Sequence, residues 1–130
     1  MAIDLRKSRF ATEIIGIDNR PEHAEEAVKL GIIDRVADFE SGVKEADIVL
    51  LALPVDQIIQ LLPRVLDLIS PSSTVADVGS AKRQIVASVA GHPLRGNFVA
   101  THPMAAPEMK PKWCWTRWSS GRVAERLLVG

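Results

Sequence analysis

The chain has 130 residues, of which 47% are hydrophobic and 25% charged, an ordinary balance for one globular domain that buries its own core. Its 16 Lys and Arg offset its 16 Asp and Glu, and this zero net charge argues against nucleic acid or an anionic membrane surface as the main partner. A single cysteine, Cys114, rules out a disulfide within the chain, no apolar run reaches the roughly 18 residues of a membrane span, and residues 1–7 lack the features of a secretory signal, so we expect a cytoplasmic protein.

The first part of the chain alternates short apolar runs with helical patterns. In chain order we expect the end of a helix in 1–9, a buried strand at 13–18, a helix over 22–30, a short strand within 32–39 and a helix over 40–46. Pro21 suits the first turn of the second of these helices, and Gly31 is placed to end it in a left-handed conformation.

The second part carries stronger patterns. In chain order we expect a strand at 47–53, a helix over 55–69, a strand at 74–78, a helix over 82–90 and a strand at 97–101. The first of these strands is apolar on both faces, as a buried parallel strand should be, and Pro54 ends it. Pro63 is expected to restart or kink the long helix.

Strands that alternate with helices predict a parallel sheet covered on both faces. In such sheets ligands bind outside the carboxyl ends of the strands. The polar and turn residues expected at those ends are Asp18, Pro54, Gly79, Ser80 and His102. Their common position is the first indication of a functional site.

Asp18 ends an expected strand just before a helix. In a dinucleotide fold such an acid accepts hydrogen bonds from the adenosine ribose hydroxyls and repels a 2′-phosphate, which favours NAD. A helix-capping aspartate is the alternative, and Arg20 keeps NADP open because a nearby arginine accommodates the extra phosphate. The glycine-rich phosphate loop is absent, since 17 residues precede Asp18 and their only glycine, Gly16, lies inside the strand.

Ser80 and His102 are the candidate pair for proton handling. Ser80 follows Gly79 at a strand-to-helix corner and His102 follows the next expected strand, so adjacent parallel strands would bring both to one edge of the sheet. A hydroxyl beside an imidazole suits proton transfer. Taken singly, Ser80 also fits a helix N-cap, and His102 fits a structural or exposed histidine. We interpret His23 and His92 as solvated and assign no metal ligands.

Several segments resemble the prephenate dehydrogenase family. The resemblance covers about residues 1–108 and rests on 13–18, 30–34 and 46–54, and most specifically on Asp77-Val78-Gly79-Ser80-Ala81-Lys82 and Thr101-His102-Pro103-Met104-Ala105. It implies an α/β Rossmann-like fold with a doubly wound parallel sheet, here lacking the first strand and the glycine-rich loop.

The resemblance implies oxidative decarboxylation of prephenate to 4-hydroxyphenylpyruvate in tyrosine biosynthesis, with hydride transfer to NAD or NADP. By position, His102 matches the family's catalytic histidine, which accepts the proton of the substrate hydroxyl, and Ser80 matches the serine that orients both groups. Glu108 matches an acid near the substrate mouth. The residues implied at the cofactor are Asp18, Arg20, Pro54 and Gly79.

The chain departs from the family pattern near its end. Ala106-Pro107 stands where the family has glycine and threonine before Glu108. The helical second domain, which in the usually homodimeric family supplies the dimer interface and an arginine for the prephenate carboxylate, has no counterpart. We therefore expect a partial dinucleotide-binding domain at 1–108, an irregular tail at 109–130, and an inactive or partial form of the enzyme.

A missing first strand has a physical consequence. In the usual order it lies between the strands expected at 13–18 and 47–53, so its absence would leave two strand edges unpaired. Each buried unpaired backbone group costs on the order of 1–3 kcal/mol. Direct closure of the two halves, into an altered order of five strands or fewer, is the alternative. We expect NAD to bind weakly or not at all because its phosphates lose a helix N-terminus.

Two other functions stay open. A non-catalytic Rossmann-like domain could act by association through exposed strand edges. Another hydroxy-acid dehydrogenase of the wider 6-phosphogluconate dehydrogenase-like superfamily would share the fold. Within the first interpretation, the choice between prephenate and arogenate as substrate is also open.

Overall fold

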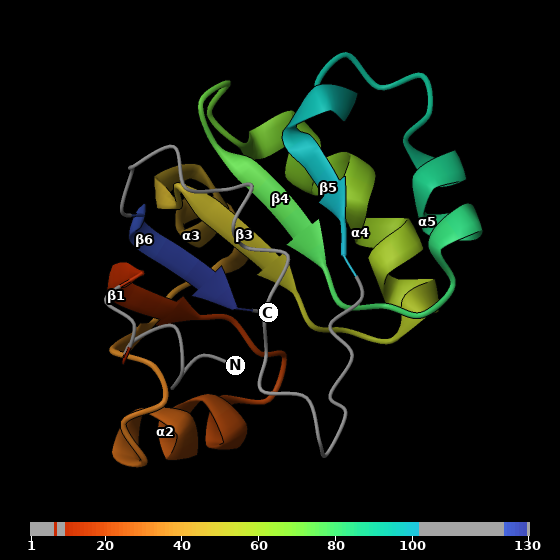
Figure 1. The fold of residues 1–130 in the computed structure, drawn as a ribbon. Coiled ribbons are helices and arrows are strands. Elements are labelled where there is room, and N and C mark those ends of the chain that lie inside the picture. The colour runs from red at the N-terminus through yellow and green to blue at the C-terminus, as the bar shows by residue number, and fades with distance from the viewer. Residues whose placement is uncertain (1–6, 8–9, 102–123, 130) are drawn as a thin grey trace.

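A six-stranded parallel sheet with helices on both faces forms the described part of the chain (Figure 1). The computed structural model describes residue 7, residues 10–101 and residues 124–129, so the predicted positions His102 and Glu108 lie outside the described residues. The strands are β1 (Ala11–Gly16), β2 (Arg35–Val36), β3 (Ile48–Leu51), β4 (Thr74–Asp77), β5 (Phe98–Ala100) and β6 (Ala124–Val129). The helices are α2 (Pro21–Lys29), α3 (Phe39–Glu45), α4 (Val55–Leu68) and α5 (Lys82–Ser88), with a 3-10 turn at Arg95–Asn97.

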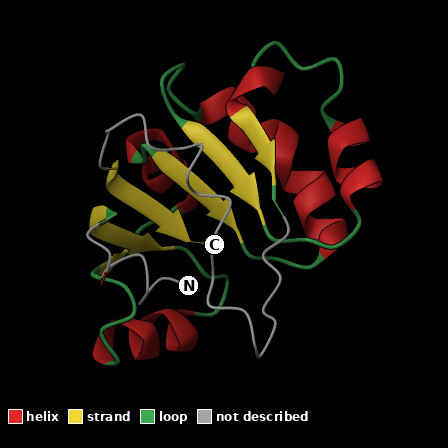
Figure 2. Cartoon of the chain, viewed as in Figure 1, coloured by secondary structure: helices red, strands yellow, loops and turns green. Residues whose placement is uncertain are grey.

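The strand order is β2-β1-β6-β3-β4-β5, so the chain winds outward from the centre in both directions. Helices lie on both faces of the sheet (Figure 2). One buried cluster joins α2 to one face, and a larger one joins α3, α4 and α5 to the other. This arrangement confirms the predicted α/β Rossmann-like, doubly wound sheet. Among the described helices, none combines the length and the apolar character that a bilayer crossing requires.

The centre of the sheet is occupied by β6, and this corrects two expectations. The sequence predicts an irregular tail at 109–130, but residues 124–129 form a strand. It also predicts open edges on β1 and β3, but β6 pairs in parallel with both of them, at Ile15↔Leu128 and Val49↔Leu128 for example. Closure into five strands or fewer is therefore wrong, because the tail supplies the backbone groups that the two inner edges need.

The larger core forms around α4. Its residues Ile58, Leu62, Val65 and Leu66 are completely buried, and their spacing is that of one helical face. Burial of each such side chain contributes about 1.5–3 kcal/mol. The helix continues through Pro63 from Val55 to Leu68, so the predicted restart is not observed.

Gly31 confirms the predicted end of α2. Its φ of +67° lies in the left-handed region, and its amide donates to the carbonyl of Val28 at 2.9 Å. A side chain at Gly31 would meet no atom within 4 Å, so the backbone conformation rather than space explains the glycine.

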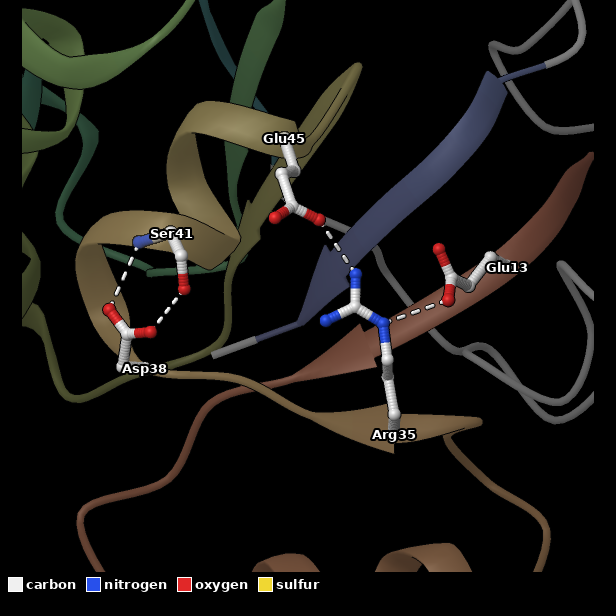
Figure 3. A network of polar contacts seen from close by, with 5 residues as sticks. All are labelled: Glu13, Arg35, Asp38, Ser41 and Glu45. Carbon is white, nitrogen blue, oxygen red and sulfur yellow. Dashed lines mark hydrogen bonds and ion pairs between the residues drawn. The ribbon is translucent and has the colours of Figure 1, made fainter.

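A polar network ties the edge strand β2 to β1 and α3 (Figure 3). Arg35 donates from Nε to Glu13 at 2.9 Å and from Nη2 to Glu45 at 2.8 Å. These hydrogen bonds, the one to Glu13 first, raise the pKa of Arg35. Asp38 begins α3 by accepting from the Ser41 amide at 3.0 Å, and the hydrogen bond from the Ser41 hydroxyl lowers the pKa of Asp38.

We predict that Leu128→Pro unfolds or strongly destabilises the protein. Proline removes an amide donor from a strand paired on both sides and interrupts both ladders, so we expect a loss of about 3 kcal/mol or more in the free energy of unfolding, measured by urea denaturation. Leu128→Val is the matched control, because it keeps the amide and suits a strand. Equal stability of the two variants would contradict the central position of β6.

Candidate functional site at the carboxyl edge of the sheet

The carboxyl ends of the strands meet along one edge of the sheet. The register aligns Gly16, Val129 and Leu50 across β1, β6 and β3, and Leu51, Asp77 and Ala100 across β3, β4 and β5. The loops that carry the predicted residues Asp18, Pro54 and Ser80 therefore leave the sheet on the same side, as does Thr101, the last described residue before His102.

The tip of β1 borders a cavity of about 220 Å³. Asp18 and His23 give it polar groups, and the rest of its wall is glycine and apolar: Gly16, Ile17, Ala24, Ala27, Ile32, Ile33 and Ala52. The glycine at position 16 lets Ile33 pack against the backbone of β1, because a Cβ there would lie 2.3 Å from Cδ1 of Ile33. A small cavity with an acid at its rim can hold a flat, largely apolar group that also carries hydroxyls.

Asp18 is 40% exposed and does not cap α2. One carboxylate oxygen accepts from the Arg20 amide at 2.8 Å, and the other lies 3.8 Å from Nδ1 of His23. The helix-cap alternative for Asp18 is therefore wrong, since Arg20 occupies the N-cap position and α2 has no side-chain cap. His23 is 55% exposed, which agrees with its predicted solvation, although it also lines the cavity.

Pro54 lies at the tip of β3, where it is exposed and precedes the first turn of α4. Its carbonyl accepts from the Ile58 amide at 3.0 Å, which begins the helix. Since β6 and β3 separate β1 from β4, the tips that carry Asp18 and Ser80 are three strand spacings apart, roughly 14 Å. The edge is therefore suited to an extended ligand that crosses the central strands.

Gly79 and Ser80 form the corner between β4 and α5. Gly79 is buried, whereas Ser80 is exposed. The N-cap position of α5 is Ala81 and no side chain caps this helix, so the alternative of Ser80 as a helix N-cap is wrong. The carbonyl of Ser80 accepts from the Lys82 amide at 3.1 Å.

Asp77 connects this corner to the neighbouring strand. Its side chain is completely buried, and its Oδ2 accepts from the Gly79 amide at 2.9 Å and from the ammonium of Lys82. Its Oδ1 accepts from the Thr101 amide at 3.3 Å, and the Thr101 hydroxyl donates to the Asp77 carbonyl. The corner that carries Ser80 and the residue before His102 are thus joined through one carboxylate.

Sequence reasoning assigned no role to Asp77, Lys82 or Thr101, although these residues stand in the two most specific matching segments. The sequence does carry a signal for two of them. Asp77 ends an apolar strand and Lys82 follows five positions later, a pattern that suggests a buried charge with a nearby partner.

His92 is not solvated as predicted. Its side chain is only 13% exposed, its Nε2 lies 3.0 Å from Oδ1 of Asp67, and its Nδ1 accepts from the Leu94 amide at 3.1 Å. These contacts tie the loop before β5 to α4, which is a structural role away from the carboxyl edge.

Comparison with known proteins agrees with this architecture. The family model described as prephenate dehydrogenase, nucleotide-binding domain, matches residues 1–112. A prephenate dehydrogenase of Bacillus subtilis (strain 168) is 42% identical over 109 residues, which are 81% of this chain and 29% of that protein. The chain therefore spans less than a third of the length of this relative.

Two solved structures of Aquifex aeolicus prephenate dehydrogenase share the fold. One has a TM-score of 0.71 at 34% identity and aligns with 83% of this chain and 39% of its own. The other, in complex with hydroxyphenyl propionate and NAD+, has a TM-score of 0.65 at 32% identity and aligns with 83% of this chain and 38% of its own.

We predict that Gly79→Ala destabilises the protein by about 1–3 kcal/mol, because the added methyl has no space in a packed core. Its Cβ would lie 2.8 Å from Cδ1 of Ile85, 3.1 Å from Cδ1 of Ile58 and 3.2 Å from Oδ2 of Asp77. Gly96→Ala is the matched control, since a Cβ there meets nothing within 4 Å. Urea denaturation that gives the same stability for both variants would contradict the close packing at the corner.

Proposed function

The chain belongs to the prephenate dehydrogenase family, and from that premise we propose that it is the nucleotide-binding part of an enzyme that oxidises and decarboxylates prephenate with NAD. Since it spans 29% of the Bacillus subtilis relative, the activity of a whole enzyme is a proposal for this chain. The observation that carries it is the junction of the Ser80 corner with the end of β5, where the sequence continues into His102.

NAD is the cofactor we propose. The Aquifex aeolicus relative was solved in complex with NAD+, and the cavity beside Asp18 is of a size and composition suited to part of an adenosine group. The exposed carboxylate of Asp18 would accept hydrogen bonds from ribose hydroxyls and repel a 2′-phosphate. Arg20 is exposed beside it and is the residue that would admit NADP. Pro54 and Gly79 would border the cofactor at the tips of β3 and β4.

Bound NAD would supply the hydride acceptor. We propose that Ser80 orients the ring hydroxyl of the substrate and that the neutral imidazole of His102 takes its proton while hydride leaves the carbon that bears it. The ring carboxylate departs as carbon dioxide, and the electrons of the broken carbon–carbon bond complete the aromatic ring. His102 then returns the proton to the phenolate oxygen, which gives the hydroxyl of 4-hydroxyphenylpyruvate. Glu108 is proposed at the mouth of the substrate site. Arogenate, which would react in the same way, is the alternative substrate, and a cytoplasmic location suits both.

The association domain is less well supported than the enzyme. That alternative depended on exposed inner edges, and β6 covers them. The outer strands β2 and β5 have only two and three residues, and such short edges offer little backbone for pairing with another chain.

We predict that NAD binds weakly but measurably, with a dissociation constant on the order of 100 µM, about −5.5 kcal/mol, in isothermal titration calorimetry. Weak binding is expected because the described contacts available to NAD at the tip of β1 are limited to a small cavity and one exposed carboxylate. Asp18→Ala should weaken binding about tenfold, as expected for the loss of a charge-assisted hydrogen bond. Asp18→Asn should in addition raise the affinity for NADP relative to NAD.

The matched control for this titration is Glu25→Ala, which removes an exposed carboxylate from α2 and should leave the affinity unchanged. Low-micromolar affinity for NAD would overturn the expectation of weak binding. No detectable binding, or a preference for NADP in the unsubstituted protein, would overturn the assignment of NAD.

We predict that Ser80→Ala and His102→Asn each lower prephenate-dependent NADH formation by about 100-fold or more, the usual contribution of a positioned acid or base. NADH absorbance at high protein concentration is the measurement, and NAD affinity should be unchanged in both variants. Ser88→Ala, at the other end of α5, is the matched serine control. Turnover that survives both substitutions would contradict the proposed roles. Complete absence of turnover in the unsubstituted chain would restrict the proposal to nucleotide binding.

A further inference from the structure

We propose that Asp77, paired with Lys82 and Thr101, is a positioning residue that holds the Ser80 corner at a fixed distance from the end of β5. The inference rests on the proposed function, because that function assigns roles to Ser80 and to the residue that follows Thr101. The network itself consists of described contacts and stands apart from any assignment of substrate.

The carboxylate of Asp77 lies where water does not reach it. Asp77 is completely buried at the end of β4, in a region lined by fully buried Ile58 and Ile85. A carboxylate loses its hydration there, and this is tolerated only when other donors replace the water. Lys82, whose side chain is 28% exposed, extends back from the first turn of α5 to provide the opposite charge.

The two carboxylate oxygens of Asp77 accept hydrogen bonds from different parts of the chain. Oδ2 accepts from the Gly79 amide and from Lys82, both of which belong to the corner and to α5. Oδ1 accepts from the Thr101 amide, which belongs to the neighbouring chain segment. One rigid planar group therefore contacts both sides of the edge where Ser80 and His102 are proposed to act.

The hydrogen bonds of Thr101 lie just beyond the point where the pairing of β4 with β5 ends. Pairing between β4 and β5 ends at Asp77↔Ala100, so the backbone of Thr101 is the first to lie beyond it. The hydrogen bonds of Thr101 to the Asp77 carboxylate and carbonyl continue the connection past that point. Among the described residues, these hydrogen bonds are the side-chain contacts that join the end of β4 directly to Thr101. A displacement of about 1 Å between reacting groups can lower a rate about 100-fold, so such a connection matters for chemistry.

The first test is hydrogen exchange of single amides, measured by NMR on the full chain. Asp77→Asn keeps the shape of the side chain but removes its charge, and we expect the Gly79 and Thr101 amides to exchange at least about tenfold faster than the general change in stability explains. Val49, buried in β3, serves as the reference amide. Acceleration of all three amides by one common factor would overturn the proposal, because Asp77 would then be only a stability residue.

If Asp77→Asn does not fold, substitutions at Thr101 test the same network from its other side. Thr101→Val removes the hydroxyl and should accelerate exchange at Gly79 relative to Val49. Thr101→Ser retains the hydroxyl and should restore the protection of the unsubstituted chain. Identical exchange in the two variants would overturn the role of Thr101 in the network.

The second test is a double-mutant cycle on prephenate-dependent NADH formation. We expect Asp77→Asn to lower kcat about 10- to 100-fold with little change in the KM for NAD, and to have little further effect in a Ser80→Ala background. Full additivity would overturn action through Ser80. If the unsubstituted chain shows no turnover, the proposed reaction fails, whereas the exchange experiment still decides whether the network holds the edge together.

Discussion

The fold depends on the pairing of β6 with strands on both of its sides. The chain builds β1 and β2 in one region and β3, β4 and β5 in another, and in the described sheet β6 is the strand that pairs with both groups. Parallel strands are stable when both of their edges and both of their faces are covered. With β6 in place, the backbone groups of β1 and β3 are paired and the two groups of strands share one sheet. The two apolar clusters can then form on opposite faces.

The continuous sheet also creates the candidate site. Because the strands are paired in one sheet, the tips of β1, β3, β4 and β5 lie along a single edge. The Asp18 cavity lies on one side of the central strand and the Ser80 corner on the other. The two parts differ physically. The Asp18 side is an open, largely apolar cavity with exposed polar groups at its rim. The Ser80 side is held by a buried carboxylate and a lysine. Such a division suits a ligand that is bound at one end and reacts at the other.

Local signals predicted most of the elements. Three features have the predicted form: the helical spacing of apolar residues in α4, the end of α2 at Gly31, and β3 as a strand that is apolar on both faces. Each of them depends on neighbours within a few residues along the chain. One prediction that proved wrong depended on a distant partner. His92 is protected because Asp67 on α4 reaches it. The Ser80 N-cap alternative is wrong for a local reason, because Ala81 stands between Ser80 and the first residue of α5 and occupies the N-cap position.

By itself, the sequence determined the alternation of strands and helices, the parallel sheet, the family, and the edge at which Asp18 and Ser80 would emerge. Periodicity and turn residues carry that information locally. Tertiary structure alone decided where the last strand lies, because the apolar residues of β6 do not specify a partner, and β1 lies more than 100 residues earlier in the chain. It also decided the partners of Asp77, since a buried charge is stable only where folding brings donors from separate strands and a helix to the same carboxylate.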